Sequence, residues 1–183
     1  SFDRFDAVGP IDLESGEPID IGVVAGGEKV TALQLPALPA GTNVLVAAVG
    51  DVSSGRPSDD DAFGLLAVFP GGDTAFIGQN PFVYALHASP DTPAVAIFAG
   101  STALVPQLPT GAFGGPVQVR PGAYTLDFFA AVEGPVSVNP GIPPAASAQT
   151  PLLAAGGQYL AIAAGDLAGI GDTAFRVIFV SGA

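Results

Sequence analysis

Short apolar runs, bounded by Gly, Pro, Asn or Asp, recur along the whole chain. Branched and aromatic residues are frequent in these runs, and several runs alternate: in residues 123–129, Tyr124, Leu126 and Phe128 all point to one face. No segment has the sustained helical period of about 3.6 residues. The pattern predicts an all-β chain, with strands at 19–24, 43–49, 63–69, 82–88, 94–100, 116–120, 123–129, 158–164 and 175–180.

The chain also repeats itself. AGTNVLVAAVGDV (40–52) aligns with AGGQYLAIAAGDL (155–167), and three further pairs of segments match: 61–69 with 172–180, 23–28 with 128–133, and 9–13 with 115–119. The first half has no counterpart of residues 82–113. We therefore predict an incomplete β-sandwich unit at 1–76, built from the later strands of the repeat, a linker at 77–81 and a complete unit at 82–183. A sandwich without its first strands exposes unpaired backbone groups, so we expect something to cover its open edge.

Three segments of the second half carry a family resemblance. FVYALHASPDTPAVAIFAG (82–100), VRPGAYTLDFF (119–129) and LLAAGGQYLAIAAGDL (152–167) resemble the DUF4397 domain family. Residues 82–183 resemble a full copy, and residues 1–70 the later strands of a second copy. The resemblance implies tandem immunoglobulin-like antiparallel β-sandwiches in secreted or surface-attached proteins, and it implies no catalytic residues.

Composition narrows the classes of partner. The chain has 17 acidic and 5 basic residues, and its net charge of −12 argues against nucleic acid, which needs a basic surface. The same charge disfavours anionic membranes, and the apolar runs are too short to cross a bilayer, so we expect no membrane insertion. With no cysteine, disulfides and thiolate sites are excluded.

The segment HASPDTP (87–93) holds the only histidine, together with Ser89 and Asp91, which invites a hydrolase interpretation. However, Ser-Pro-Asp is a good turn sequence, and Pro90 and Pro93 bend the chain. We therefore predict a structural turn motif of His87, Ser89, Pro90 and Asp91, with no catalytic residues.

Other aspartates are candidates for a catalytic or a calcium site. The Asp-Thr pairs at 73, 91 and 172 resemble the loops of aspartic proteases. However, Asp61, which aligns with Asp172, has no threonine after it, and this favours a turn over a catalytic pair of aspartates. The densest acidic run, Asp59, Asp60 and Asp61, is a weak candidate calcium site; without the D-x-D-x-D-G spacing, a solvated loop is the other interpretation. Calcium is thus the one cofactor considered, and otherwise none is expected.

These observations predict a non-enzymatic, extracellular or cell-surface structural protein. We expect it to be a subunit of a filament or layer made of copies of itself, with the incomplete sandwich completed by strands from a neighbouring chain or an upstream segment. The alternative is a ligand-binding or adhesion module of a larger secreted protein, for glycan, calcium or protein.

Overall fold

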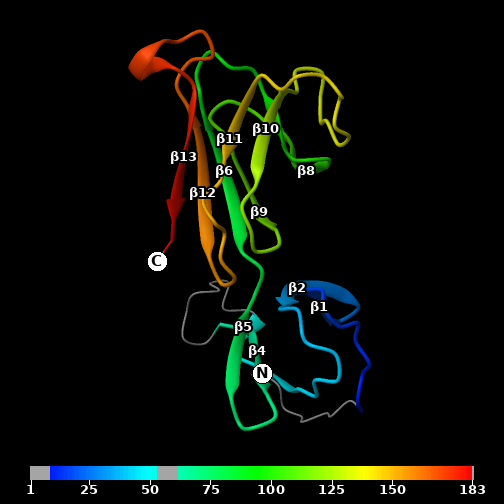
Figure 1. Cartoon of the computed structure of the whole chain (residues 1–183). Coiled ribbons are helices and arrows are strands. Elements are labelled where there is room, and N and C mark those ends of the chain that lie inside the picture. Colours follow the sequence, from blue (N-terminus) through cyan, green and yellow to red (C-terminus); the bar gives the residue numbers. More distant parts are fainter. Residues whose placement is uncertain (1–8, 53–61, 183) are drawn as a thin grey trace. The chain divides into compact units, whose positions relative to one another are not determined.

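The computed structural model describes residues 9–52 and 62–182, and these form two compact units, Ser1–Asn80 (unit 1) and Pro81–Ala183 (unit 2). Each unit has its own sheets (Figure 1). Each also has its own cluster of buried hydrophobic side chains. The all-β prediction is confirmed: apart from 3-10 turns at Val52 and at Gly171–Thr173, the regular elements of the described residues are strands. No helix in this part of the chain is long and apolar enough to cross a membrane.

Unit 2 consists of two four-stranded sheets, in the orders β11-β10-β7-β8 and β13-β12-β6-β9. Its strands are β6 Phe82–Ala88, β7 Val95–Ala99, β8 Thr102–Leu108, β9 Phe113–Gln118, β10 Thr125–Ala130, β11 Ala146–Gln149, β12 Gln158–Ala164 and β13 Arg176–Ser181.

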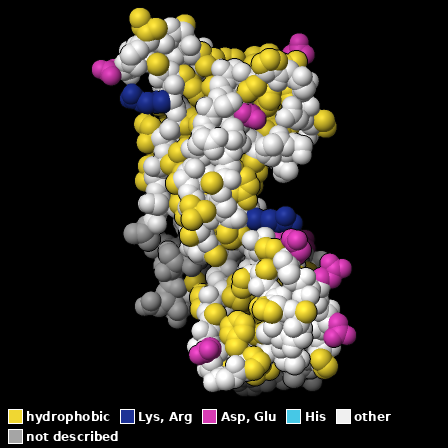
Figure 2. Space-filling model, in the orientation of Figure 1, with side chains coloured by type: hydrophobic (Ala, Val, Ile, Leu, Met, Phe, Trp, Pro, Cys, Tyr) yellow, Lys and Arg dark blue, Asp and Glu magenta, His cyan; other side chains and the backbone are white. Residues whose placement is uncertain are grey.

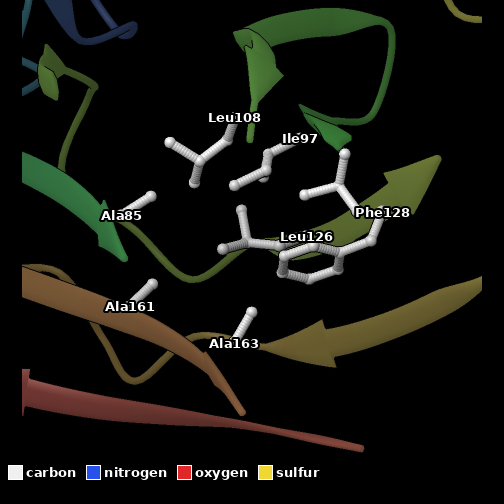
Figure 3. Close-up of a cluster of buried hydrophobic side chains, with 8 residues drawn as sticks. Ala85, Ile97, Leu108, Leu126, Phe128, Ala161 and Ala163 are labelled. Atoms are coloured by element: carbon white, nitrogen blue, oxygen red, sulfur yellow. The ribbon is translucent and has the colours of Figure 1, made fainter. Parts of the chain in front are cut away.

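The core of unit 2 lies between these two sheets. Strands β6 and β12 contribute small side chains, whereas β7, β8 and β10 contribute larger ones, and all point toward one another (Figure 3). The buried members are Ala85, Val95, Ile97, Leu108, Leu126, Phe128, Ala161 and Ala163. Alternation of buried and less buried positions along β12 places every second side chain in this core.

One pairing corrects the prediction of purely antiparallel sandwiches. Strand β6 pairs with β12 in parallel, from Phe82 opposite Gln158 to Ala88 opposite Ala164. These strands are separated by a long stretch of chain, so no hairpin forces them to run in opposite directions. The sheet is therefore mixed.

The described part of unit 1 has five strands in two sheets, the hairpin β1-β2 and the sheet β3-β4-β5. They are β1 Ile19–Ala25, β2 Glu28–Leu35, β3 Leu45–Val49, β4 Gly64–Val68 and β5 Thr74–Gly78. Its buried cluster is drawn from β2, β4, β5 and Phe63: Leu33, Leu35, Phe63, Leu65, Ala67 and Ile77. Strand β3 contributes no fully buried side chain to it.

Four strands lie outside the predicted runs: β2, β5, β8 and β11. Strand β11 (ASAQ) has no branched or aromatic residue, and β8 contains Pro106, so neither has the composition typical of a strand. The end of β5, at Ile77 and Gly78, falls in the segment predicted as a linker.

Replacing Phe98 tests the packing of unit 2. Its side chain is fully buried and packs edge-to-face on Phe129, so Phe98→Ala should lower the free energy of unfolding by about 3–5 kcal/mol. Phe113→Ala is the matched control: this side chain is 60% exposed and stacks only on Tyr84, so its loss should cost about 1 kcal/mol or less. Urea denaturation of both variants checks this, and equal losses would contradict the core assignment.

Candidate functional site

The HASPDTP segment lies at the end of β6 and continues into the turn that leads to β7. His87 and Ser89 are fully buried, and Thr92 is nearly so, whereas Asp91 is exposed. The backbone of His87 also bonds the chain just before β9, since its N–H donates to Ala112 O and its carbonyl accepts from Gly111 N–H. The turn is thus fixed on both sides.

Both ring nitrogens of the His87 imidazole have hydrogen-bond partners within the turn. Its Nδ1 accepts from the backbone N–H of Ser89 at 3.4 Å, and its Nε2 lies 3.0 Å from the carbonyl oxygen of Pro93. Because a carbonyl only accepts, Nε2 carries the hydrogen and donates to Pro93. The ring therefore holds the two ends of the turn together.

Ser89 connects the turn to a distant loop. Its Oγ donates to the carbonyl of Gly165, directly after β12, and its remaining capacity is to accept from Thr92 Oγ1 at 2.5 Å. Asp91 reaches the same loop, because its Oδ1 accepts from the Leu167 N–H at 3.3 Å. Two side chains of the turn therefore bind the Gly165–Leu167 backbone.

This geometry differs from that of a Ser-His-Asp triad, although His87, Ser89 and Asp91 do lie together. In a triad the imidazole accepts the serine hydroxyl hydrogen and the carboxylate holds the imidazole. Here the hydroxyl hydrogen goes to Gly165, and Asp91 contacts Ser89 and Thr92 instead of His87. The arrangement binds one loop to another and leaves Ser89 no base.

The remaining candidates are the aspartates. The calcium candidate, Asp59, Asp60 and Asp61, lies outside the described residues. Within residues 9–52 and 62–182 no three histidine or acidic side chains gather closely enough to hold a metal ion. Asp51 and Asp166 each form an isolated bridge after a strand, to Ala62 and Ala174 respectively.

Those two bridges show that unit 1 reproduces the last strands of unit 2. Antiparallel β3–β4 corresponds to β12–β13, since Leu45 faces Val68 as Leu160 faces Val180. The hairpin β1–β2 likewise corresponds to the antiparallel pair β10–β11.

Local details of the two copies agree as well. The Thr42 N–H donates to Pro39 O at 3.2 Å, as the Gly157 N–H donates to Ala154 O at 3.0 Å. The glycines that end β3 and β12 share a left-handed backbone, with φ of 83° in both Gly50 and Gly165. A side chain in that conformation is strained, which accounts for glycine at both positions.

The structure corrects one alignment of the repeat. The sequence comparison pairs 61–69 with 172–180, but the bridges and strand registers pair 62–69 with 174–181. Ala62-Phe63 then matches Ala174-Phe175. Aligning the aspartates before the strand had shifted the register by one residue.

Two strand edges of unit 1 have no partner among its described strands. In unit 2, β12 lies between β13 and β6, and β10 lies between β11 and β7. Among the described residues of unit 1, β3 pairs only with β4, and β1 only with β2. Both unpartnered edges are the ones that β6 and β7 occupy in the complete unit. We call the edge of β3 the open edge.

Side chains of unit 1 are accordingly more exposed to solvent than their counterparts in unit 2. Val46 of β3 is 41% exposed, whereas its counterpart Ala161 in β12 is 3% exposed. Residues 9–13 form no strand, although their counterpart 115–119 overlaps β9, which pairs with β6. Ile11 and Leu13 are consequently exposed. Figure 2 shows hydrophobic side chains at the surface among scattered acidic ones.

Sequence reasoning found the turn but not the residues that receive it, Gly165 and Leu167. The available signal was the Gly-Asp pair shared by the repeat, at 50–51 and 165–166.

A family comparison supports the assignment of unit 2: the family described as "Domain of unknown function (DUF4397)" matches residues 81–181. No curated protein and no solved structure matches the chain.

Ser89→Ala tests the role of the turn. It removes the donor to the Gly165 carbonyl and leaves a partly buried acceptor unsatisfied, so unit 2 should lose about 1–3 kcal/mol of stability in urea denaturation. Ser101→Ala, at an exposed turn residue, is the control and should change stability by less than about 0.5 kcal/mol. Indistinguishable variants would show that the Ser89 contact does not hold the fold.

Proposed function

The chain belongs to the DUF4397 family, and on that premise we propose that it is a non-enzymatic structural protein of the cell surface or extracellular space. Its two units are tandem immunoglobulin-like sandwiches, the first incomplete at its N-terminus. A neighbouring chain or an upstream segment supplies the strands that unit 1 lacks, and donation between chains links copies into a filament or layer.

The open edge of β3 is the observation that carries this proposal. An unpaired strand edge presents free donors and acceptors to any other strand. Natural edges are usually protected by Lys, Pro, a bulge or an inward charge, whereas β3 reads Leu-Val-Ala-Ala-Val and has none of these. An edge of that kind suits pairing with another strand.

The missing partner sets the geometry of assembly. The open edge corresponds to a site that β6 fills in unit 2, so a donated strand and its acceptor are different surfaces. Such a contact is head-to-tail, and repeated head-to-tail contacts form open filaments unless a ring closes. The non-enzymatic part of the proposal is supported by the turn, where His87 and Ser89 are engaged with backbone groups.

Hydrogen exchange of the native assembly tests the proposal. In protein recovered from its own cells, the amides of Val46 and Ala48 should be protected as strongly as those of their counterparts, Ala161 and Ala163. In the isolated chain the amides of β3 should exchange at least about tenfold faster than those of β12.

Electron microscopy of the recovered material should show filaments or sheets. A native protein that sediments as a monomer and whose β3 amides exchange freely would contradict the proposal.

A further inference from the structure

We infer that the segment that completes unit 1 has the design of residues 82–99: an apolar strand, a turn reading His-x-Ser-Pro-Asp, and a second apolar strand. The inference rests on the proposed function and names the partner's chemistry. The evidence is a short backbone segment after β12, residues 165–167, which binds the turn in unit 2. Unit 1 has the corresponding segment at residues 50–52.

The receiving backbone is short and defined. In unit 2, Ser89 Oγ donates to Gly165 O and Asp91 Oδ1 accepts from Leu167 N–H. The loop is held by Asp166, whose N–H donates to Thr173 O at 2.8 Å and whose carbonyl accepts from Phe175 N–H at 2.9 Å. This loop therefore offers one carbonyl and one N–H in a fixed position.

Unit 1 has the corresponding backbone at residues 50–52, directly after β3. Gly50, Asp51 and Val52 stand where unit 2 has Gly165, Asp166 and Leu167, as the register of the two strand pairs requires. The bridge from Asp51 to Ala62 is parallel, like that from Asp166 to Ala174, and both glycines have φ of 83°. Unit 1 thus keeps the receptor for a Ser-Pro-Asp turn and has no such turn of its own.

The strand edge leads directly to that receptor. In β12, Gly157 O accepts from Phe82 N–H of β6, and Gly182 N–H on the opposite side donates to Gln158 O. Because successive residues of a strand direct their backbone groups to opposite edges, Gly157 and every second residue after it face β6, ending at Gly165. The counterparts on the open edge are Thr42, Val44, Val46, Ala48 and Gly50.

A strand that pairs with these groups arrives with its turn over Gly50 and Val52. Its serine hydroxyl then donates to Gly50 O, and its aspartate accepts from Val52 N–H. The chain beyond the turn can pair with β1, as β7 pairs with β10 in unit 2. Residues 82–99 themselves are built into the two sheets of unit 2, so the segment that completes unit 1 is a different one of the same design.

The test uses the full 183-residue chain and a fluorescent peptide of residues 82–99, flanked by lysines for solubility. We expect saturable binding by fluorescence anisotropy, a higher melting temperature, and protection of the Val46 and Ala48 amides. In the peptide, Ser89→Ala should weaken binding roughly three- to tenfold, by loss of one hydrogen bond. Ala88→Ser, at an exposed position, is the matched control peptide and should bind normally.

A variant of the chain tests the edge. Val46→Pro removes one N–H that faces the open edge while leaving the β3–β4 bonds, and it should weaken binding at least about tenfold with β12 exchange unchanged. Should this variant misfold, the peptide series on the natural chain still decides.

Three results would overturn the inference: no binding, equal binding of the Ser89→Ala peptide, or loss of protection in β12 on binding, which would mean that the peptide had displaced β6 of unit 2. If native assemblies form with β3 protected and the peptide fails, only this inference falls. If the peptide binds as expected and the native protein is monomeric, only the proposed assembly falls.

Discussion

Strand β6 is the element on which the architecture of unit 2 depends. It satisfies the backbone of β12 on one side and of β9 on the other, and its last residues place Ser89 on the Gly165 carbonyl. Unit 1 shows what the same sequence pattern becomes without such a strand. Its β3 keeps an open edge, residues 9–13 form no strand, and the face corresponding to the core of unit 2 is partly exposed.

The described strands of unit 1 form without a counterpart of β6 because most of their pairings join neighbours in the chain. Each of the pairs β1–β2 and β3–β4 joins strands that follow one another in the chain, and the β1–β2 turn contains Gly26 and Gly27, both in left-handed conformations. Closing a short loop costs less entropy than bringing distant segments together. The pairing of β6 with β12 is the opposite case, since it joins strands separated by most of unit 2 and therefore costs more entropy to close.

This difference also explains what the sequence could predict. The runs at 82–88 and 158–164 coincide with β6 and β12, because alternation and composition are local signals. The parallel pairing of those strands, and the attachment of the turn to Gly165 and Leu167, join residues far apart in the chain, and no local pattern encodes them. Strand β11, with its sequence Ala-Ser-Ala-Gln, exists because β10 offers it a partner, not because of its own propensity.

The outermost strands of unit 2 make the open edge of unit 1 stand out by contrast. Strand β8 contains Pro106, β9 contains Pro116, β11 alternates with polar residues, and β13 begins at Arg176. Each of these features limits pairing with a further strand. Strand β3 is apolar throughout, and it is followed by Gly50, whose counterpart Gly165 accepts a hydrogen bond from the Ser89 hydroxyl. An edge without protection and with an intact receptor at its end has the properties of a binding site for a strand, whereas the protected edges of unit 2 have those of a finished surface.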